Sequence, residues 1–86
     1  MTANGPTPAD RAALVVGASV RFTTAPTWAP HLDGIVFTIE HATYGLGGMM
    51  DAQTRADIAA GWPHLVLVDR SGRRYGATGR RVRVVS

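Results

Sequence analysis

The sequence predicts a small, mainly β domain with one helix longer than two turns. Apolar and polar residues alternate with a period of two in several short stretches, and turn signals separate these stretches closely. Residues 50–60 are rich in helix formers, and Gly61 and Pro63 supply a stop. A chain of 86 residues has the length of one domain with a thin core. We expect residues 1–13 to be a lead-in with a short helical turn and residues 14–86 to be the domain.

The first regular element is that short helical turn. Thr7 is a suitable N-cap, Pro8 suits the first helical position, and Asp10 places an acid in the first turn. From Val16 the hydrophobic period changes to two, which predicts a strand whose even-numbered residues, through Phe22, face the core.

A loop rich in proline follows this strand. It carries Trp28 between two prolines and ends at the turn signal Asp33-Gly34. Residues 35–40 then alternate again, which predicts a second strand with its odd-numbered residues inside.

Three shorter strands complete the predicted sheet. Residues 65–68 are an apolar strand, and residues 69–72 have the composition of a tight hairpin turn. Tyr75 and Ala77 alternate on a fourth strand, and residues 82 and 84 alternate on the last. Five short strands predict a partly open β-barrel. Its expected core is Val20, Phe22, Ile35, Phe37, Leu67, Val82 and Val84.

This strand series resembles an SH3-like barrel. The resemblance lies in "VGASVRFTTAP", "LDGIVFTI", "HLVLVDRSGRRYGA" and "RRVRVV", with a long loop, an Asp-x-x-Gly hairpin and a short closing strand. It is similar in particular to the KOW-type and related small barrels of ribosome-, transcription- and phage-associated proteins. The pattern covers about residues 14–85. It departs from such barrels at residues 44–62, where a glycine-rich loop and a helix replace a short connection.

A second topology is compatible with the middle of the chain. Residues 35–69 also match a strand, a glycine-rich turn, a helix and a strand, as in a dinucleotide-binding βαβ unit. The spacing of Gly45, Gly47 and Met50 lacks the third glycine, and the chain is too short for the remaining strands. The barrel is therefore the favoured interpretation.

Positive charge is concentrated at the C-terminal end. Residues 70–86 hold six arginines and no acid, whereas residues 1–69 hold three arginines and all six acids. The alternation of the last strand turns Arg81 and Arg83 outward, and Arg74 shares that face if the preceding strand is their neighbour. Crowded guanidinium groups suit phosphates, which they bind in a bidentate manner. The leading hypothesis is a non-enzymatic module whose C-terminal hairpin binds nucleic acid through Arg73, Arg74, Arg80, Arg81 and Arg83.

Two other interpretations of the surface remain open. The arginines are equally compatible with a solvated face paired with Asp69, Glu40 and Asp33. The alternative function is a protein-interaction or assembly module, phage-encoded or virion-associated, that uses a loop tryptophan and an apolar, glycine-containing segment. The residues of this second surface are Trp28, Tyr44, Leu46, Met49 and Met50. Because only Tyr75 among the aromatic residues lies in the basic segment, the sequence does not separate single-stranded from duplex or structured nucleic acid.

The remaining motifs argue against an enzyme, a metal site and a cofactor site. The chain has no cysteine, and its serines show no nucleophile-elbow pattern. The spacing of His31, Asp33, His41 and His64 does not force a metal site. No stretch reaches a membrane-spanning length and the first residues lack a signal-peptide pattern, so we expect a cytoplasmic or virion-associated protein. The use of arginine alone, with no lysine, indicates a GC-rich coding genome such as that of an actinobacterium or one of its phages.

Overall fold

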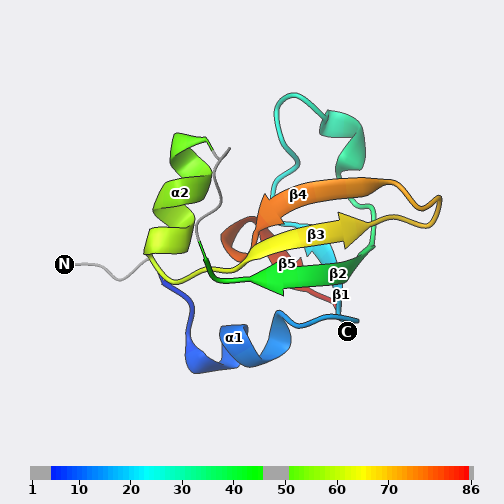
Figure 1. Cartoon of the computed structure of the whole chain (residues 1–86). Coiled ribbons are helices and arrows are strands. Elements are labelled where there is room, and N and C mark those ends of the chain that lie inside the picture. Colours follow the sequence, from blue (N-terminus) through cyan, green and yellow to red (C-terminus); the bar gives the residue numbers. More distant parts are fainter. Residues whose placement is uncertain (1–4, 46–50, 86) are drawn as a thin grey trace.

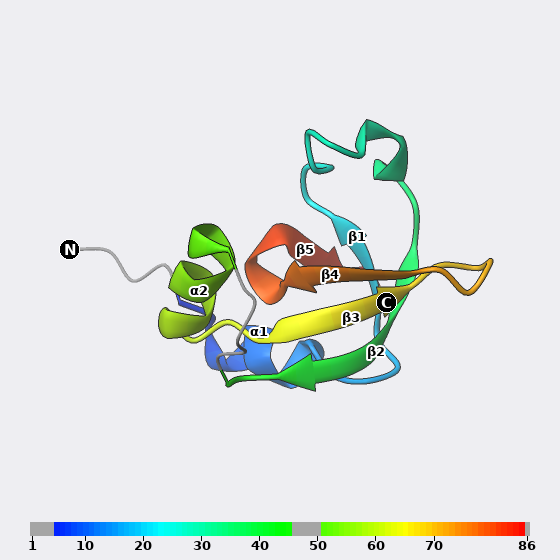
Figure 2. The ribbon, with the colours of Figure 1, turned by 45° about the horizontal axis from the view of Figure 1, so that its top comes forward.

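The fold is built on one antiparallel sheet of five strands. The computed structural model of the chain describes residues 5–45 and 51–85. The strands are β1 (Ser19–Phe22), β2 (Phe37–Thr43), β3 (His64–Val68), β4 (Arg74–Thr78) and β5 (Val82–Val84). Their order in the sheet is β4-β3-β2-β1-β5, so β4 and β5 are the two edges and the sheet is not closed by pairing among the described residues. The sheet curls: β1 crosses β3 and β4 at a steep angle, and β5 lies behind these strands (Figures 1 and 2).

Alternation within the first two strands is confirmed, with one correction at the start of β1. Val20 and Phe22 are buried while Arg21 is exposed, and Phe37 is fully buried on β2. Val16 was expected to face the core, but its side chain is 65% exposed. The strand begins three residues later, at Ser19, because Gly17 turns the chain with φ 94. The Gly17 N–H donates a hydrogen bond to Ile39 O.

The predicted hairpin turn between β3 and β4 is confirmed. Gly72 has φ 89, a left-handed conformation that glycine adopts without steric cost. The Asp69 carboxylate accepts hydrogen bonds from the backbone N–H of Ser71 at 2.9 Å and of Arg73 at 3.0 Å. These bonds close the turn and hold β3 and β4 in register.

The last two strands do not form a hairpin, which corrects the expected arrangement. A 3-10 turn, η2 (Gly79–Arg81), leads from β4 to β5, and β5 pairs with β1. A side chain at Gly79 would place its Cβ 2.7 Å from Leu14 Cδ1 and 3.1 Å from Pro63 Cδ, so a larger residue at the crossing would have to displace these two side chains. The Arg-rich segment is therefore divided between opposite edges of the sheet.

Two helices flank the sheet (Figure 1). Helix α1 (Pro8–Ala13) begins with the predicted Thr7 cap, which exchanges hydrogen bonds with Asp10. Helix α2 (Ala52–Ala59) lies within the predicted range 50–60 and is the longer of the two. In the described part of the chain, no helix is long and apolar enough to cross a membrane.

The βαβ alternative for the middle of the chain is wrong. Helix α2 joins β2 to β3, but these two strands are antiparallel neighbours. A βαβ unit requires parallel strands.

The core lies on the inner face of the curled sheet. Five of the seven predicted core residues are buried, and Ile35 and Val84 are half-buried and pack against the cluster. Phe37 is its centre, with ring centroids 5.5 Å from Phe22 and 5.5 Å from Tyr75 in edge-to-face contacts. The buried hydrophobic residues that the prediction did not include are Leu14, Ala29, Leu32, Ile39, Ile58, Leu65 and Ala77.

Candidate nucleic-acid interface

Arg74 is held by an acid on a nearby strand. Its Nε donates to Glu40 Oε1 at 2.6 Å and its Nη2 to Glu40 Oε2 at 3.1 Å, a bidentate pair. The hydrogen bond from Arg74 lowers the pKa of Glu40, and the same bond raises the pKa of Arg74. The pairing register between β2 and β3 shifts at this position, between Ile39 and His41. Arg74 is thus already neutralised on the outer surface.

Arg80 and Arg81 lie beside a buried carboxylate on α2. Asp57 is 3% exposed and accepts a hydrogen bond from Arg80 Nη1 at 3.3 Å, while Arg81 Nε lies 4.0 Å from its other oxygen. Thr78 Oγ1 and Gln53 Nε2 donate to the same carboxylate at 2.7 and 2.9 Å. The arginine side chains remain 48% and 42% exposed. Two guanidinium groups share one carboxylate, which leaves net positive charge at the surface.

Arg73 lies at the hairpin turn, away from these groups. Its backbone N–H donates to Asp69 and its side chain is exposed. The hydrogen bond from the Ser71 hydroxyl, at 2.7 Å, is the main cause that lowers the pKa of Asp69. The expectation that Arg74, Arg81 and Arg83 share one outward face of a hairpin is wrong, because β4 and β5 are not neighbours.

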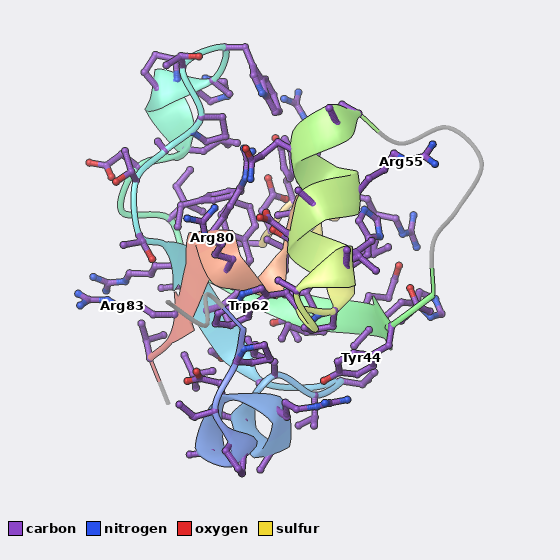
Figure 3. All side chains as sticks on the ribbon, turned by 90° about the vertical axis from the view of Figure 1, so that its left-hand side faces the viewer. Tyr44, Arg55, Trp62, Arg80 and Arg83 are labelled. Carbon is purple, nitrogen blue, oxygen red and sulfur yellow. The ribbon has the colours of Figure 1, made fainter. Side chains whose placement is uncertain are left out.

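Arg83 has a different neighbour, which the sequence did not indicate. In the β1–β5 ladder Arg83 is directly opposite Arg21, and both side chains are exposed. Neither forms an ion pair with an acid in residues 5–45 or 51–85. Figure 3 shows Arg83 pointing outward from β5, with Arg80 near α2. The alternation of the first strand predicts that Arg21 points outward, but no local pattern predicts that this strand pairs with the last one.

A third arginine extends this pair across the start of β2. Arg21 and Arg83 line a hollow with Gly34, and Arg70 lines the adjoining hollow with Gly34 and Val36. The β1–β2 register, which pairs Val20 with Phe37, places Val36 beside Arg21. We call Arg21, Arg70 and Arg83 the outer arginine strip. Asp33 also lines the first of these hollows.

The residues of the predicted protein-interaction surface are not all together. Trp28 is 71% exposed on the β1–β2 loop. Tyr44 follows β2 at the other end of the molecule, with the Arg11 guanidinium 4.6 Å from its ring centroid (Figure 3). Leu46, Met49 and Met50 lie outside the described residues.

The histidines and Asp33 do not gather into a site. Within the described residues, no group of three His, Cys, Asp or Glu side chains is arranged to hold a metal ion.

Comparison of the chain with protein-family models, with curated proteins and with solved structures finds no match in any of the three.

Proposed function

We propose that this chain is a non-enzymatic binding module that contacts nucleic-acid phosphates through the outer arginine strip. The observation that carries the proposal is the cross-strand pair Arg21–Arg83, which has no acidic partner in the described chain. Like charges directly opposite each other on neighbouring strands destabilise a sheet. A bound phosphate offsets this cost because each guanidinium donates bidentate hydrogen bonds to it.

Other parts of the surface add to this attraction. Arg70 lies across Val36 from Arg21, and Arg80 with Arg81 carry more charge than Asp57 neutralises. Arg74, in contrast, adds little to the proposed site because its bidentate pair with Glu40 neutralises its charge. The site therefore differs from the predicted hairpin: it includes Arg21 and Arg70, it omits Arg73 and Arg74, and it is centred on β1 and β5.

We also propose that the fold is a partly open SH3-like barrel, as the sequence resemblance implies. Supporting features are the antiparallel order of β1 to β4, the long loop that ends at Gly34, and the return of β5 to pair with β1. A chain whose last strand pairs with its first bends the sheet toward closure.

The test is a salt titration of binding to labelled oligonucleotides. With about three phosphates neutralised, log affinity should fall against log salt with a slope of about −2 to −3. The double variant Arg21→Ala/Arg83→Ala should reduce the magnitude of that slope by about 1.5 to 2. The charge-matched control is Arg11→Ala/Arg55→Ala, because Arg11 faces Tyr44 and Arg55 lies on the other side of the molecule from Arg83 (Figure 3). Absence of binding at low salt, or equal slopes for the two double variants, would refute the proposal.

The second candidate function is a protein contact centred on Trp28. The observation that favours it is the 71% exposure of this large apolar side chain, the highest among the exposed large hydrophobic residues described. Its test is co-purification from the host after nuclease treatment. A specific protein recovered with the parent and lost with Trp28→Ala would support this candidate.

A further inference from the structure

Trp28 is presented by an ordered loop and not by a loosely attached one. The neighbouring Ala29 and the following Leu32 are each only 1% exposed, so the loop is anchored in the core just before its 3-10 turn η1 (Pro30–Leu32) and at the last residue of that turn. Backbone hydrogen bonds from Ala29 N–H to Pro26 O, at 3.0 Å, and from Leu32 N–H to Ala29 O, at 3.1 Å, fix its path. The indole is therefore held in solvent by a structured segment, although burial of an aromatic ring is strongly favourable.

Three hollows that share lining residues link Trp28 to the Arg21–Arg83 pair. The hollow that contains Arg21 and Arg83 shares Thr23 with a second hollow, which contains Arg80 and Arg81. That second hollow shares Pro26 and Arg81 with a third hollow, lined by Trp28. We call these three hollows together the path. Four arginines line it, Arg21, Arg80, Arg81 and Arg83, and the exposed Trp28 lines its last hollow. The residues that line it with hydroxyl groups are Thr23, Thr24, Thr27, Thr54 and Thr78.

The acids on this path affect its two ends differently. Asp51 lines the hollow at Trp28, and a hydrogen bond from the Thr54 N–H, at 2.7 Å, is the main cause that lowers its pKa, so it stays ionised. An ionised carboxylate beside Trp28 repels a phosphate but tolerates an uncharged base. Asp57 is buried under Arg80. Asp33 also lines the hollow of Arg21 and Arg83, but there two arginines outnumber one acid, so that hollow remains positively charged. The arginine end of the path suits phosphates and the Trp28 end suits a base.

From this arrangement we infer that the ligand is a single-stranded nucleic acid, one of whose bases stacks on Trp28 while its phosphates follow the path to Arg21 and Arg83. The inference rests on the proposed phosphate-binding function and names its substrate class. A paired base inside a duplex has both faces covered by its neighbours, whereas an unpaired base exposes a face to an aromatic side chain. A positively charged groove that ends on an aromatic ring is the arrangement that single-strand binders use.

The experiment compares a labelled single-stranded 12-mer of thymidine with a blunt 12-base-pair duplex, by fluorescence anisotropy at low salt. We expect tighter binding of the single strand by the parent. Trp28→Ala should weaken single-strand binding about 5- to 150-fold, as loss of one stacked base does, and leave the salt slope unchanged because no charge is removed. Trp28→Phe should retain most of the affinity. Tyr44→Ala is the control, an exposed aromatic residue at the other end of the molecule.

A second measurement reports the stacked ring directly. In a Trp62→Phe background, Trp28 is the only tryptophan of the chain, and its emission should be quenched on addition of the single strand but not of the duplex. Equal affinity for both oligonucleotides, with full single-strand affinity in Trp28→Ala, overturns the inference, leaves the phosphate-binding function standing, and assigns Trp28 to the protein contact. Absence of binding to either oligonucleotide overturns both.

Discussion

The Arg74–Glu40 pair shows how a single contact changes the meaning of a basic sequence. Arg74 belongs to a segment, residues 70–86, that contains no acid, yet its Nε and Nη2 donate to a carboxylate contributed by β2. Both side chains are on the surface, so the pair contributes little to the free energy of unfolding. Its main effect is on charge, because Glu40 offsets the positive charge that Arg74 would otherwise add to the surface.

The charge state of Glu40 provides a test at this scale. Since Arg74 lowers the pKa of Glu40 in the folded chain, the stabilisation from the pair is present above the ordinary pKa of glutamate and is lost as the pH falls through the lowered value. In Arg74→Ala the Glu40 pKa should rise toward its ordinary value. An NMR titration of the Glu40 carboxyl carbon measures this change. Arg73→Ala, which removes the adjacent arginine, is the control and should leave the Glu40 pKa unchanged. Identical Glu40 titrations in the parent and Arg74→Ala would contradict the pair.

At the scale of elements, one buried carboxylate joins α2 to the end of β4 and to η2. The Asp57 carboxylate accepts hydrogen bonds from Thr78 on the strand and from Arg80 on the 3-10 turn. Both Asp57 and Thr78 are almost completely buried. The helix is therefore attached by hydrogen bonds as well as by Ile58, which is 7% exposed. The same contact positions Arg80 and Arg81 on the path to Trp28.

The Thr78 hydroxyl tests this attachment. Thr78→Val keeps the shape of the side chain but removes the 2.7 Å donor to Asp57, which leaves a buried carboxylate oxygen without that partner. We expect a loss of about 1–3 kcal/mol in the free energy of unfolding, measured by urea denaturation. Thr78→Ser retains the hydroxyl and should lose less. A Thr78→Val chain as stable as the parent would show that the bond does not hold the helix.

Elements with a strong local signal were predictable from the sequence, and contacts set by distant residues were not. The period-two alternation around Val20 and Phe37 and the Gly72 turn appear in the structure as expected. The passage of the chain from β4 to β5 depends on the close packing of Gly79 against Leu14 and Pro63, which no local pattern reveals. For the same reason the candidate site differs from the predicted one. The neighbour of Arg83 is Arg21, from the first strand, and which residue lies beside Arg83 depends on which strands pair.

On the scale of the whole molecule, the curled sheet packs around three aromatic rings. Phe37 on β2 contacts Phe22 from β1 on one side and Tyr75 from β4 on the other, each edge to face. The ring therefore joins the β1–β5 part of the sheet, which carries Arg21 and Arg83, to the β3–β4 hairpin, which carries Arg70. The geometry of the outer arginine strip depends on this packing.

Phe37→Ala tests whether the two parts of the sheet form one cooperative unit. Phe37 is 0% exposed, and removal of its ring should cost about 3–5 kcal/mol. A loss of that size is a large fraction of the stability of a small domain, since native proteins are stable by only about 5–15 kcal/mol. Phe37→Leu, which keeps part of the apolar volume, should cost less. Val16→Ala, at a site 65% exposed, should change stability by no more than about 0.5 kcal/mol.

The measurement is urea unfolding followed by two probes, far-UV circular dichroism for the sheet and tryptophan fluorescence for the loops. In a single cooperative unit the two transitions coincide for the parent and shift together in Phe37→Ala. Separate transitions in the parent would mean that the chain does not unfold as one cooperative unit. A binding site that requires Arg21, Arg70 and Arg83 at fixed positions needs the coincident result, because only a joined sheet keeps arginines from its two parts in one strip.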